Sequence, residues 1–189
     1  LQASLRALAM VINDPGELLA SVNNALHEST DPEKFATLFL AVLNQDSRGL
    51  RYASAGHNPP LLLRATGESQ WLKPAGTPLG MFPDMKYPVM EVVLEPGDLI
   101  VSYTDGITEA VDQHDVEFEE EGLERVVREY RNEPGDVIIE NIISEVMLHV
   151  STNSSNGLHS LVENWDEPEN QNAGDDLTMV VIKTLKDGP

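Results

Sequence analysis

The sequence has 189 residues, no cysteine, and 32 acidic against 12 basic side chains, which gives a formal net charge of −20. This length suffices for one domain with a sizeable core, and the lack of cysteine excludes disulfides, thiolate metal ligands and a cysteine nucleophile. The negative charge argues against nucleic acid as a partner. No apolar run reaches the roughly 18 residues of a membrane span, and no basic secretory start is present. We therefore expect a cytoplasmic protein without a membrane span.

Two helices are predicted at the start of the chain. Apolar residues between Leu1 and Ile12 recur at helical spacing. Residues 14–17 (DPGE) then predict a helix start, because an aspartate can cap free backbone N–H groups and a proline fits the first helical turn. This second helix is expected to run to about Leu26.

A run of strands is predicted next. The stretch 35–43 is almost wholly apolar and short, which predicts a strand covered on both faces, and turn-forming residues connect it to a strand over 50–55. A second hairpin is predicted between 61–63 and 70–72, with a glycine at the reversal. Residues 74–88 contain four prolines and are predicted to form a loop.

The second half of the chain changes from strands to helices. Residues 90–94 and 98–103 are predicted as a strand pair, since the proline and glycine between them favour a turn. Helical spacing follows over 123–130 and 137–150, and a closing strand is predicted over 177–185. Helices, then strands, then helices and a final strand indicate an α+β fold rather than alternating βαβ units.

The domain organisation is predicted to be simple. We expect one domain over 1–189, interrupted by a flexible or disordered insertion over 151–174. That insertion is polar and acidic and contains neither lysine nor arginine. Connections of this length inside a compact domain are usually functional flaps or disordered segments.

Two acidic motifs lie next to predicted strands, where a side chain can be held at the rim of a sheet. Asp105 follows the strand ending at Tyr103, and Asp175 and Asp176 precede the last strand. Adjacent carboxylates repel each other, and a hard divalent cation such as Mg²⁺ or Mn²⁺ can hold them together. The alternative interpretation is that Thr-Asp-Gly is a turn and Asp-Asp a solvated loop end.

Two other polar segments also allow two interpretations. The sequence around His57 (AGHNPP) is either a backbone corner or a polar group directed at a site. The run 112–124 contains seven carboxylates and is either a solvated surface with a helix start or a docking surface for a basic partner. The sequence has no phosphate-binding loop of the Walker type, no serine nucleophile elbow and no HExxH motif.

Five motifs follow one another along the chain, namely FATLFLAVL, RYASAGHNPPLLL, GTPLGM, LEPGDLIVSYTDGITEA and GDDLTMVVIK. Together they resemble the bacterial serine/threonine phosphatases of the SpoIIE and RsbU type, which belong to the metal-dependent, protein phosphatase 2C-like (PPM) superfamily. The resemblance runs from Leu1 to about Tyr130 and resumes at Gly174. Five motifs in order are more specific than any one of them.

The resemblance implies an αββα four-layer sandwich with a centre of two Mn²⁺ or Mg²⁺ ions that activates water to hydrolyse phosphoserine or phosphothreonine on a protein. It implies that Asp105 and Asp175 are catalytic metal ligands and that Asp176 is a further metal-site candidate. It also implies supporting roles near the site for five further residues, namely Thr104, Gly106, Gly56, His57 and Asn58. The expected partner is a phosphorylated protein substrate, such as an anti-sigma-factor antagonist in bacterial sigma-factor regulation.

The sequence departs from the family pattern at its start. Family members carry two further aspartate motifs immediately before the helix that opens this chain, and neither is present. We therefore expect a truncated phosphatase domain that lacks its N-terminal strands and has little activity alone, although its parent protein is an enzyme. Exposed sheet edges would favour pairing, so a homodimer is also expected. The alternative is a catalytically inactive, phosphatase-like regulator that binds its partner without hydrolysis.

Overall fold

A computed structural model describes residues 1–31, 33–151 and 177–184. The chain forms two compact units. Unit 1 consists of Leu1–Pro60, Trp71–Asp98 and Thr184–Pro189, and unit 2 consists of Leu61–Gln70 and Leu99–Lys183. A single domain over 1–189 stays a prediction, and the insertion predicted over 151–174 lies, apart from its first residue, outside the described residues.

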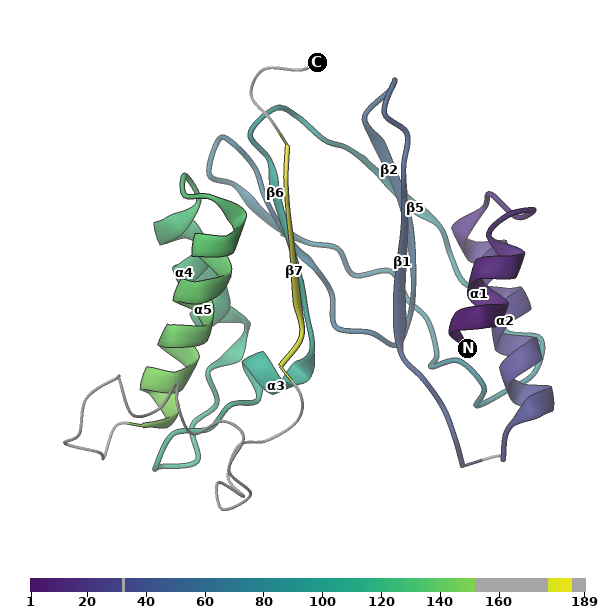
Figure 1. The fold of residues 1–189 in the computed structure, drawn as a ribbon. Coiled ribbons are helices and arrows are strands. Elements are labelled where there is room, and N and C mark those ends of the chain that lie inside the picture. Colours follow the sequence, from purple (N-terminus) through teal and green to yellow (C-terminus); the bar gives the residue numbers. More distant parts are fainter. Residues whose placement is uncertain (32, 152–176, 185–189) are drawn as a thin grey trace. The chain divides into compact units, whose positions relative to one another are not determined.

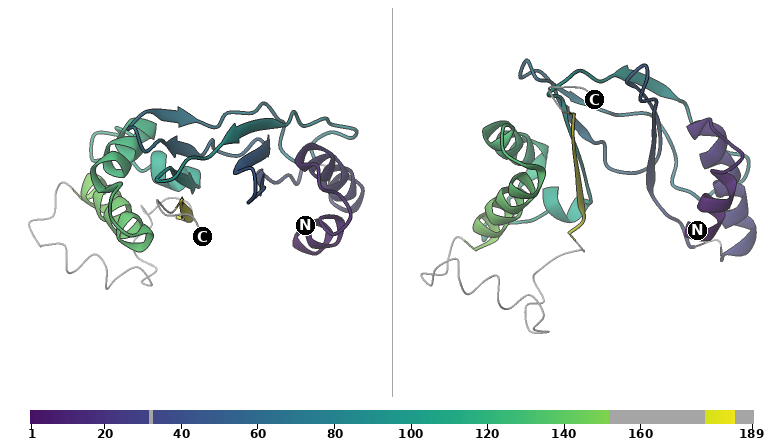
Figure 2. Two further views of the ribbon diagram at one scale, coloured as in Figure 1. Left: turned by 90° about the horizontal axis from the view of Figure 1, so that it is seen from above. Right: turned by 45° about the horizontal axis from the view of Figure 1, so that its top comes forward.

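Unit 1 begins with the two predicted helices, α1 (Gln2–Leu8) and α2 (Pro15–Ser29), which lie side by side in Figures 1 and 2. The predicted cap is confirmed, because the Asp14 carboxylate accepts hydrogen bonds from the N–H groups of Gly16 at 3.0 Å and Glu17 at 2.9 Å. One face of α2 is buried against the unit 1 sheet and against the segment between residues 71 and 90. The core there consists of Leu18, Leu19, Val22, Ala53, Ala55, Leu79 and Tyr87.

The sheet of unit 1 has the strand order β1-β2-β5, formed by β1 (Leu38–Leu43), β2 (Gly49–Ala55) and β5 (Met90–Val93). The predicted hairpin of the first two strands is confirmed. The prediction that 35–43 is a strand covered on both faces is wrong. The strand begins at Leu38, lies at the sheet edge and leaves Leu43 47% exposed, because β2 occupies the central position.

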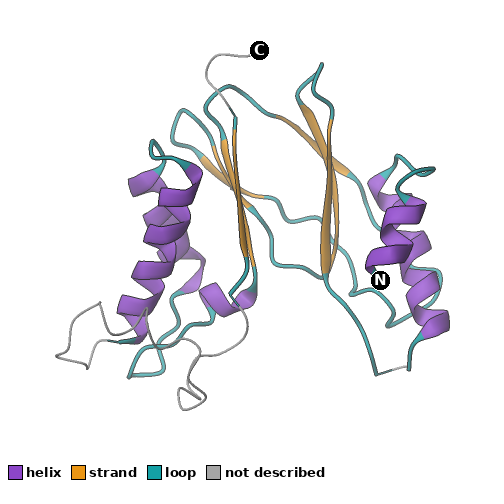
Figure 3. Ribbon diagram, in the orientation of Figure 1, coloured by secondary structure: helices purple, strands orange, loops and turns teal. Residues whose placement is uncertain are grey.

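Unit 2 contains a sheet with the strand order β4-β3-β6-β7. Its strands are drawn in orange in Figure 3. Its strands are β3 (Leu61–Leu63), β4 (Ser69–Trp71), β6 (Leu99–Tyr103) and β7 (Met179–Lys183). The helices α4 (Glu119–Tyr130) and α5 (Gly135–Val150) pack against each other and against this sheet. Their buried faces consist of Leu123, Val126, Val127, Ile138, Ile142 and Val146.

The predicted pairing of the strands over 90–94 and 98–103 is wrong. β5 pairs with β2, whereas β6 pairs with β3 and β7, so the intervening turn leads from one sheet to the other. This turn is held by the Asp98 carboxylate, which accepts a hydrogen bond from the Glu95 N–H at 2.9 Å. Turn chemistry and strand patterning identified both strands, but neither specifies which strand each one pairs with.

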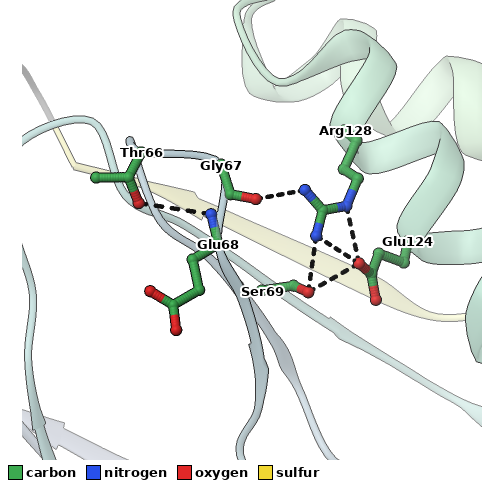
Figure 4. Close-up of polar contacts among 6 residues, drawn as sticks. All are labelled: Thr66, Gly67, Glu68, Ser69, Glu124 and Arg128. Atoms are coloured by element: carbon green, nitrogen blue, oxygen red, sulfur yellow. Dashed lines mark hydrogen bonds and ion pairs between the residues drawn. The ribbon is translucent and has the colours of Figure 1, made fainter.

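Arg128 on α4 fixes the β3–β4 hairpin to the helices of unit 2 (Figure 4). Its guanidinium donates to the Gly67 carbonyl oxygen, to Ser69 Oγ at 2.8 Å and to Glu124 Oε1 at 2.8 Å. Gly67 has a φ of 94°, as the tight reversal of the predicted hairpin requires. Partial burial acts to raise the pKa of Glu124, but hydrogen bonds from Ser69 and Arg128 outweigh it and lower that pKa.

The Asp14 cap predicts a pH-dependent contribution to stability. The hydrogen bond from the Glu17 N–H is the main reason that the pKa of Asp14 is lowered, and Arg51 contributes further against opposing desolvation. We expect Asp14→Ala to reduce the free energy of unfolding by about 1 kcal/mol at neutral pH. Because the folded-state pKa is lowered, the contribution is complete above about pH 4 and is lost as the pH falls further. Urea unfolding of the wild type and of Asp14→Ala at several pH values from about 3 to about 7 measures this contribution. The same difference in the free energy of unfolding at every pH would contradict the prediction.

Candidate functional site

The Thr-Asp-Gly motif lies where β6 ends and the short helix α3 (Asp105–Thr108) begins. Tyr103 and Ile107 are buried on either side of it, which holds the partly buried Asp105 at the rim of the sheet. The carboxylate of Asp105 accepts a hydrogen bond from the Gly106 N–H at 3.0 Å. The described residues thus present a carboxylate on a rigid strand end.

Thr104 connects this motif to the start of the last strand. In the pairing of β6 with β7, Tyr103 lies opposite Met179. Beyond that pair, the Thr104 N–H donates to the Thr178 carbonyl oxygen at 3.0 Å, and the Thr178 N–H donates to Thr104 Oγ1 at 3.0 Å. Thr178 is the threonine of the Asp-Asp-Leu-Thr motif, so the described part of that motif lies beside Thr104. Asp175 and Asp176 themselves lie outside the described residues.

Gly56, His57 and Asn58 form a backbone corner in unit 1 that we call the His57 corner. Gly56 has a φ of 70°, a conformation that favours glycine. The Ser54 hydroxyl accepts from the His57 N–H at 3.2 Å and donates to the His57 carbonyl oxygen at 3.3 Å. The backbone corner is therefore confirmed. The His57 imidazole itself contacts the Thr37 hydroxyl through Nδ1 at 3.4 Å, and a role of His57 in catalysis stays a prediction.

The GTPLGM segment (residues 76–81) packs closely against the His57 corner. This contact was not predicted from the sequence. A Cβ atom at Gly56 would lie 2.7 Å from Pro78 Cγ, and a Cβ atom at Gly76 would overlap the Ser54 carbonyl oxygen. Two motifs separated in sequence are thus in direct backbone contact. The glycines in both motifs were the available signal, since glycine in an ordered segment often marks a close backbone approach.

The acidic run 112–124 is confirmed as a surface that leads into a helix start. Its carboxylates lie on exposed or partly buried residues up to the beginning of α4 at Glu119. The Asp112 carboxylate accepts from the N–H groups of Val116 and His114, and these hydrogen bonds lower the pKa of Asp112. These contacts are internal to the loop, and the docking interpretation stays a prediction.

The donor chemistry of the Thr-Asp-Gly motif fits a hard divalent cation, because Mg²⁺ and Mn²⁺ prefer carboxylate oxygens. A single carboxylate is nevertheless an incomplete ligand set. Within residues 1–31, 33–151 and 177–184, no group of three or more His, Cys, Asp or Glu side chains could hold a metal ion. The chemistry of Asp105 therefore fits one ligand of such an ion, and its ligand role stays a prediction. Over the same ranges no helix is long and apolar enough to cross a bilayer.

Comparisons with solved structures confirm the expected fold class. The RsbU and RsbW domains of Rv1364c from Mycobacterium tuberculosis match 99% of this chain and 46% of theirs, with a TM-score of 0.73 and 24% identity. The PP2C phosphatase domain of SpoIIE from Bacillus subtilis, solved with a fragment of its regulatory domain, matches 95% of this chain and 47% of its own, with a TM-score of 0.71 and 20% identity. The chain therefore has the α+β fold of protein phosphatase 2C-like domains.

The sequence comparisons identify the family. The profile of the family described as Stage II sporulation protein E (SpoIIE) matches residues 1–185. Phosphoserine phosphatase RsbU of Bacillus subtilis strain 168 is 28% identical over 134 residues, which are 70% of this chain and 40% of RsbU. The chain belongs to the SpoIIE family and spans less than half the length of RsbU, as it does of the two solved chains above.

Proposed function

We propose that the whole protein is a metal-dependent phosphoserine/phosphothreonine protein phosphatase. The observation that carries the proposal is the pair of hydrogen bonds between Thr104 and Thr178, beside which Asp105 lies. Asp176 and Asp175 are two and three residues from Thr178 in the sequence, so the backbone can carry them at most about 7 and 11 Å from it. This short spacing in the sequence is the support for proposing that both aspartates act together with Asp105.

The proposed ligands are Asp105 and Asp175, with Asp176 beside them, and the proposed cofactor is a pair of Mn²⁺ or Mg²⁺ ions. When bound, such ions lower the pKa of a water molecule and neutralise phosphate charge. Solved domains of this fold include RsbX in complex with magnesium and a SpoIIE domain presoaked with Mn. The net charge of −20 provides a long-range attraction for cations.

The residues of this chain would hold and orient the centre. The Gly106 N–H fixes one oxygen of Asp105 and leaves the other oxygen of the carboxylate for a ligand role. The Thr104 hydroxyl, which accepts from the Thr178 N–H, fixes the threonine of the Asp-Asp-Leu-Thr motif. The His57 corner is proposed to have a supporting role only. No protein nucleophile is needed in this scheme.

The proposed substrate is a phosphorylated protein, such as an anti-sigma-factor antagonist, and the proposed setting is bacterial partner switching in the cytoplasm. The support comes from relatives, since RsbU is named a phosphoserine phosphatase and Rv1364c contains RsbU and RsbW domains. A homodimer is proposed as well. Among the described residues β7 is the last strand in the order of its sheet, and its Val180 and Ile182 side chains are exposed on one face, which supports the proposal.

The second candidate is a regulator that binds its partner without hydrolysis. Its supporting observation is the acidic run 112–124, whose carboxylates lie on exposed or partly buried residues and form a surface suited to a basic partner. The two candidates differ in one measurable respect, because only the phosphatase requires a divalent cation to act on a phosphoprotein.

Removal of the metal tests the proposal. We expect the whole protein to release phosphate from a phosphoserine protein in Mn²⁺ or Mg²⁺, to lose this activity in excess chelator, and to regain it when the metal is restored. Circular dichroism in chelator is the control for intact folding. Partner binding that persists in chelator, with no phosphate release under any metal condition, would establish the regulator instead.

A further inference from the structure

Asn23 on α2 is fully buried, and its side-chain amide is bonded to a loop far away in sequence. Its oxygen accepts from the Gly80 N–H at 2.9 Å and from the Tyr87 hydroxyl at 3.2 Å. Its nitrogen donates to the Phe82 carbonyl oxygen at 2.9 Å and to Asn24 Oδ1 at 3.2 Å. Both lone pairs and both N–H groups of the amide are thus used, which accounts for a polar side chain in the unit 1 core.

These bonds fix one end of the segment 76–82, which we call the 76–82 loop. His27, one helical turn after Asn23, contacts the Gly80 carbonyl oxygen through Nδ1 at 2.9 Å. In the middle of the loop, Leu79 pairs with Ala36 through two backbone hydrogen bonds of 2.7 and 3.0 Å. The loop therefore has little freedom to move independently of α2.

The other end of the 76–82 loop lies directly behind the His57 corner. Pro78 is in contact distance of the Cβ position of Gly56, and Gly76 is so close to the Ser54 carbonyl oxygen that no side chain fits. Ser54 in turn bonds both backbone groups of His57. A displacement of the loop would therefore displace the backbone that carries His57 and Asn58, because close-packed backbone contacts transmit strain.

We infer that Asn23 is a positioning residue of the proposed phosphatase, which sets the position of the His57 corner through the 76–82 loop. The inference rests on the proposed function for its catalytic consequence. It assigns Asn23 no contact with substrate or metal. It assigns α2 a mechanical role beyond covering one face of the unit 1 sheet.

The test compares Asn23→Ala in the whole protein with Asp14→Ala, which weakens the same helix at its other end without touching the loop. At a temperature at which both variants are folded, we expect Asn23→Ala to lower kcat about tenfold with KM changed less than about twofold, and Asp14→Ala to leave both near wild type. Asn23→Ser, which keeps a small polar group, carries the test if Asn23→Ala does not fold. A variant at Asn23 that lowers the melting temperature but leaves kcat unchanged would overturn the inference.

Amide hydrogen exchange separates this inference from the proposed function. We expect exchange of the His57 amide to become at least about tenfold faster in the Asn23 variant and to stay unchanged in Asp14→Ala. If the wild-type protein releases no phosphate while the exchange result holds, the proposed function fails and the coupling of α2 to the corner stands. Unchanged exchange at His57 would overturn the coupling itself.

Discussion

Asp105→Asn in the whole protein is expected to lower kcat for phosphoprotein hydrolysis by at least about 100-fold, with the fold intact. The amide oxygen of asparagine can still accept the Gly106 hydrogen bond that Asp105 accepts at 3.0 Å, so the local geometry has no reason to change. The substitution removes the negative charge, and a neutral amide is a weaker ligand than a carboxylate for Mg²⁺ or Mn²⁺.

The matched control is Asp112→Asn, which removes one charge from the acidic run that follows α3. The Asp112 carboxylate accepts backbone hydrogen bonds from His114 and Val116, and an asparagine can accept both. We expect near-wild-type kcat in this variant, measured as phosphate release in Mn²⁺. Equal activity of Asp105→Asn and Asp112→Asn would remove Asp105 from the proposed site.

Gly76→Ala is expected to give the largest loss of stability among single-methyl additions to unit 1. The new Cβ atom would overlap the Ser54 carbonyl oxygen, and a backbone oxygen cannot move aside as a flexible side chain can. Additions to a closely packed core cost about 1–3 kcal/mol and occasionally more. For a chain of this size each kcal/mol lowers the melting temperature by roughly 2–4 °C, so calorimetry should show a decrease of several degrees.

Gly135→Ala provides the comparison. Gly135 is the first residue of α5, and a Cβ atom there would lie 3.7 Å from Val181 Cγ1, an ordinary van der Waals distance. We expect this variant to be unchanged or more stable by about 0.4–1 kcal/mol, because alanine restricts the unfolded chain. A melting temperature for Gly76→Ala equal to that of Gly135→Ala would show that the Ser54 contact is not as close as described.

The elements of the fold were largely predictable because their signals are local. Residues 14–17 supplied both a cap and a proline for the first helical turn, and the Asp14 hydrogen bonds follow directly. Gly67 likewise marked the hairpin reversal through its left-handed backbone. The partners of β5 and β6 were not predictable, since these strands are adjacent in sequence and belong to different sheets. Pairing depends on packing between distant segments, which a single sequence does not encode locally.

The candidate site was predictable only in part for the same reason. The position of Asp105 at a strand end followed from the apolar run before it and the glycine after it. The bonds from Thr104 to Thr178 span 74 residues, and those from Asn23 to the 76–82 loop span 57 and 59. An asparagine within an amphipathic helix gives no sign of whether it faces solvent or fixes a distant loop.

Paramagnetic broadening by Mn²⁺ tests the central proposal most directly, namely that carboxylates from the Thr-Asp-Gly and Asp-Asp-Leu-Thr motifs hold the same divalent ions. In the nuclear magnetic resonance spectrum of the whole protein, substoichiometric Mn²⁺ should broaden the amide signals of Gly106 and Thr178 together, with little effect on the amide signal of Asp112. The broadening should disappear in Asp105→Asn and also in Asp175→Asn. Broadening confined to the acidic run 112–124, or broadening at Gly106 that survives both substitutions, would contradict the proposal.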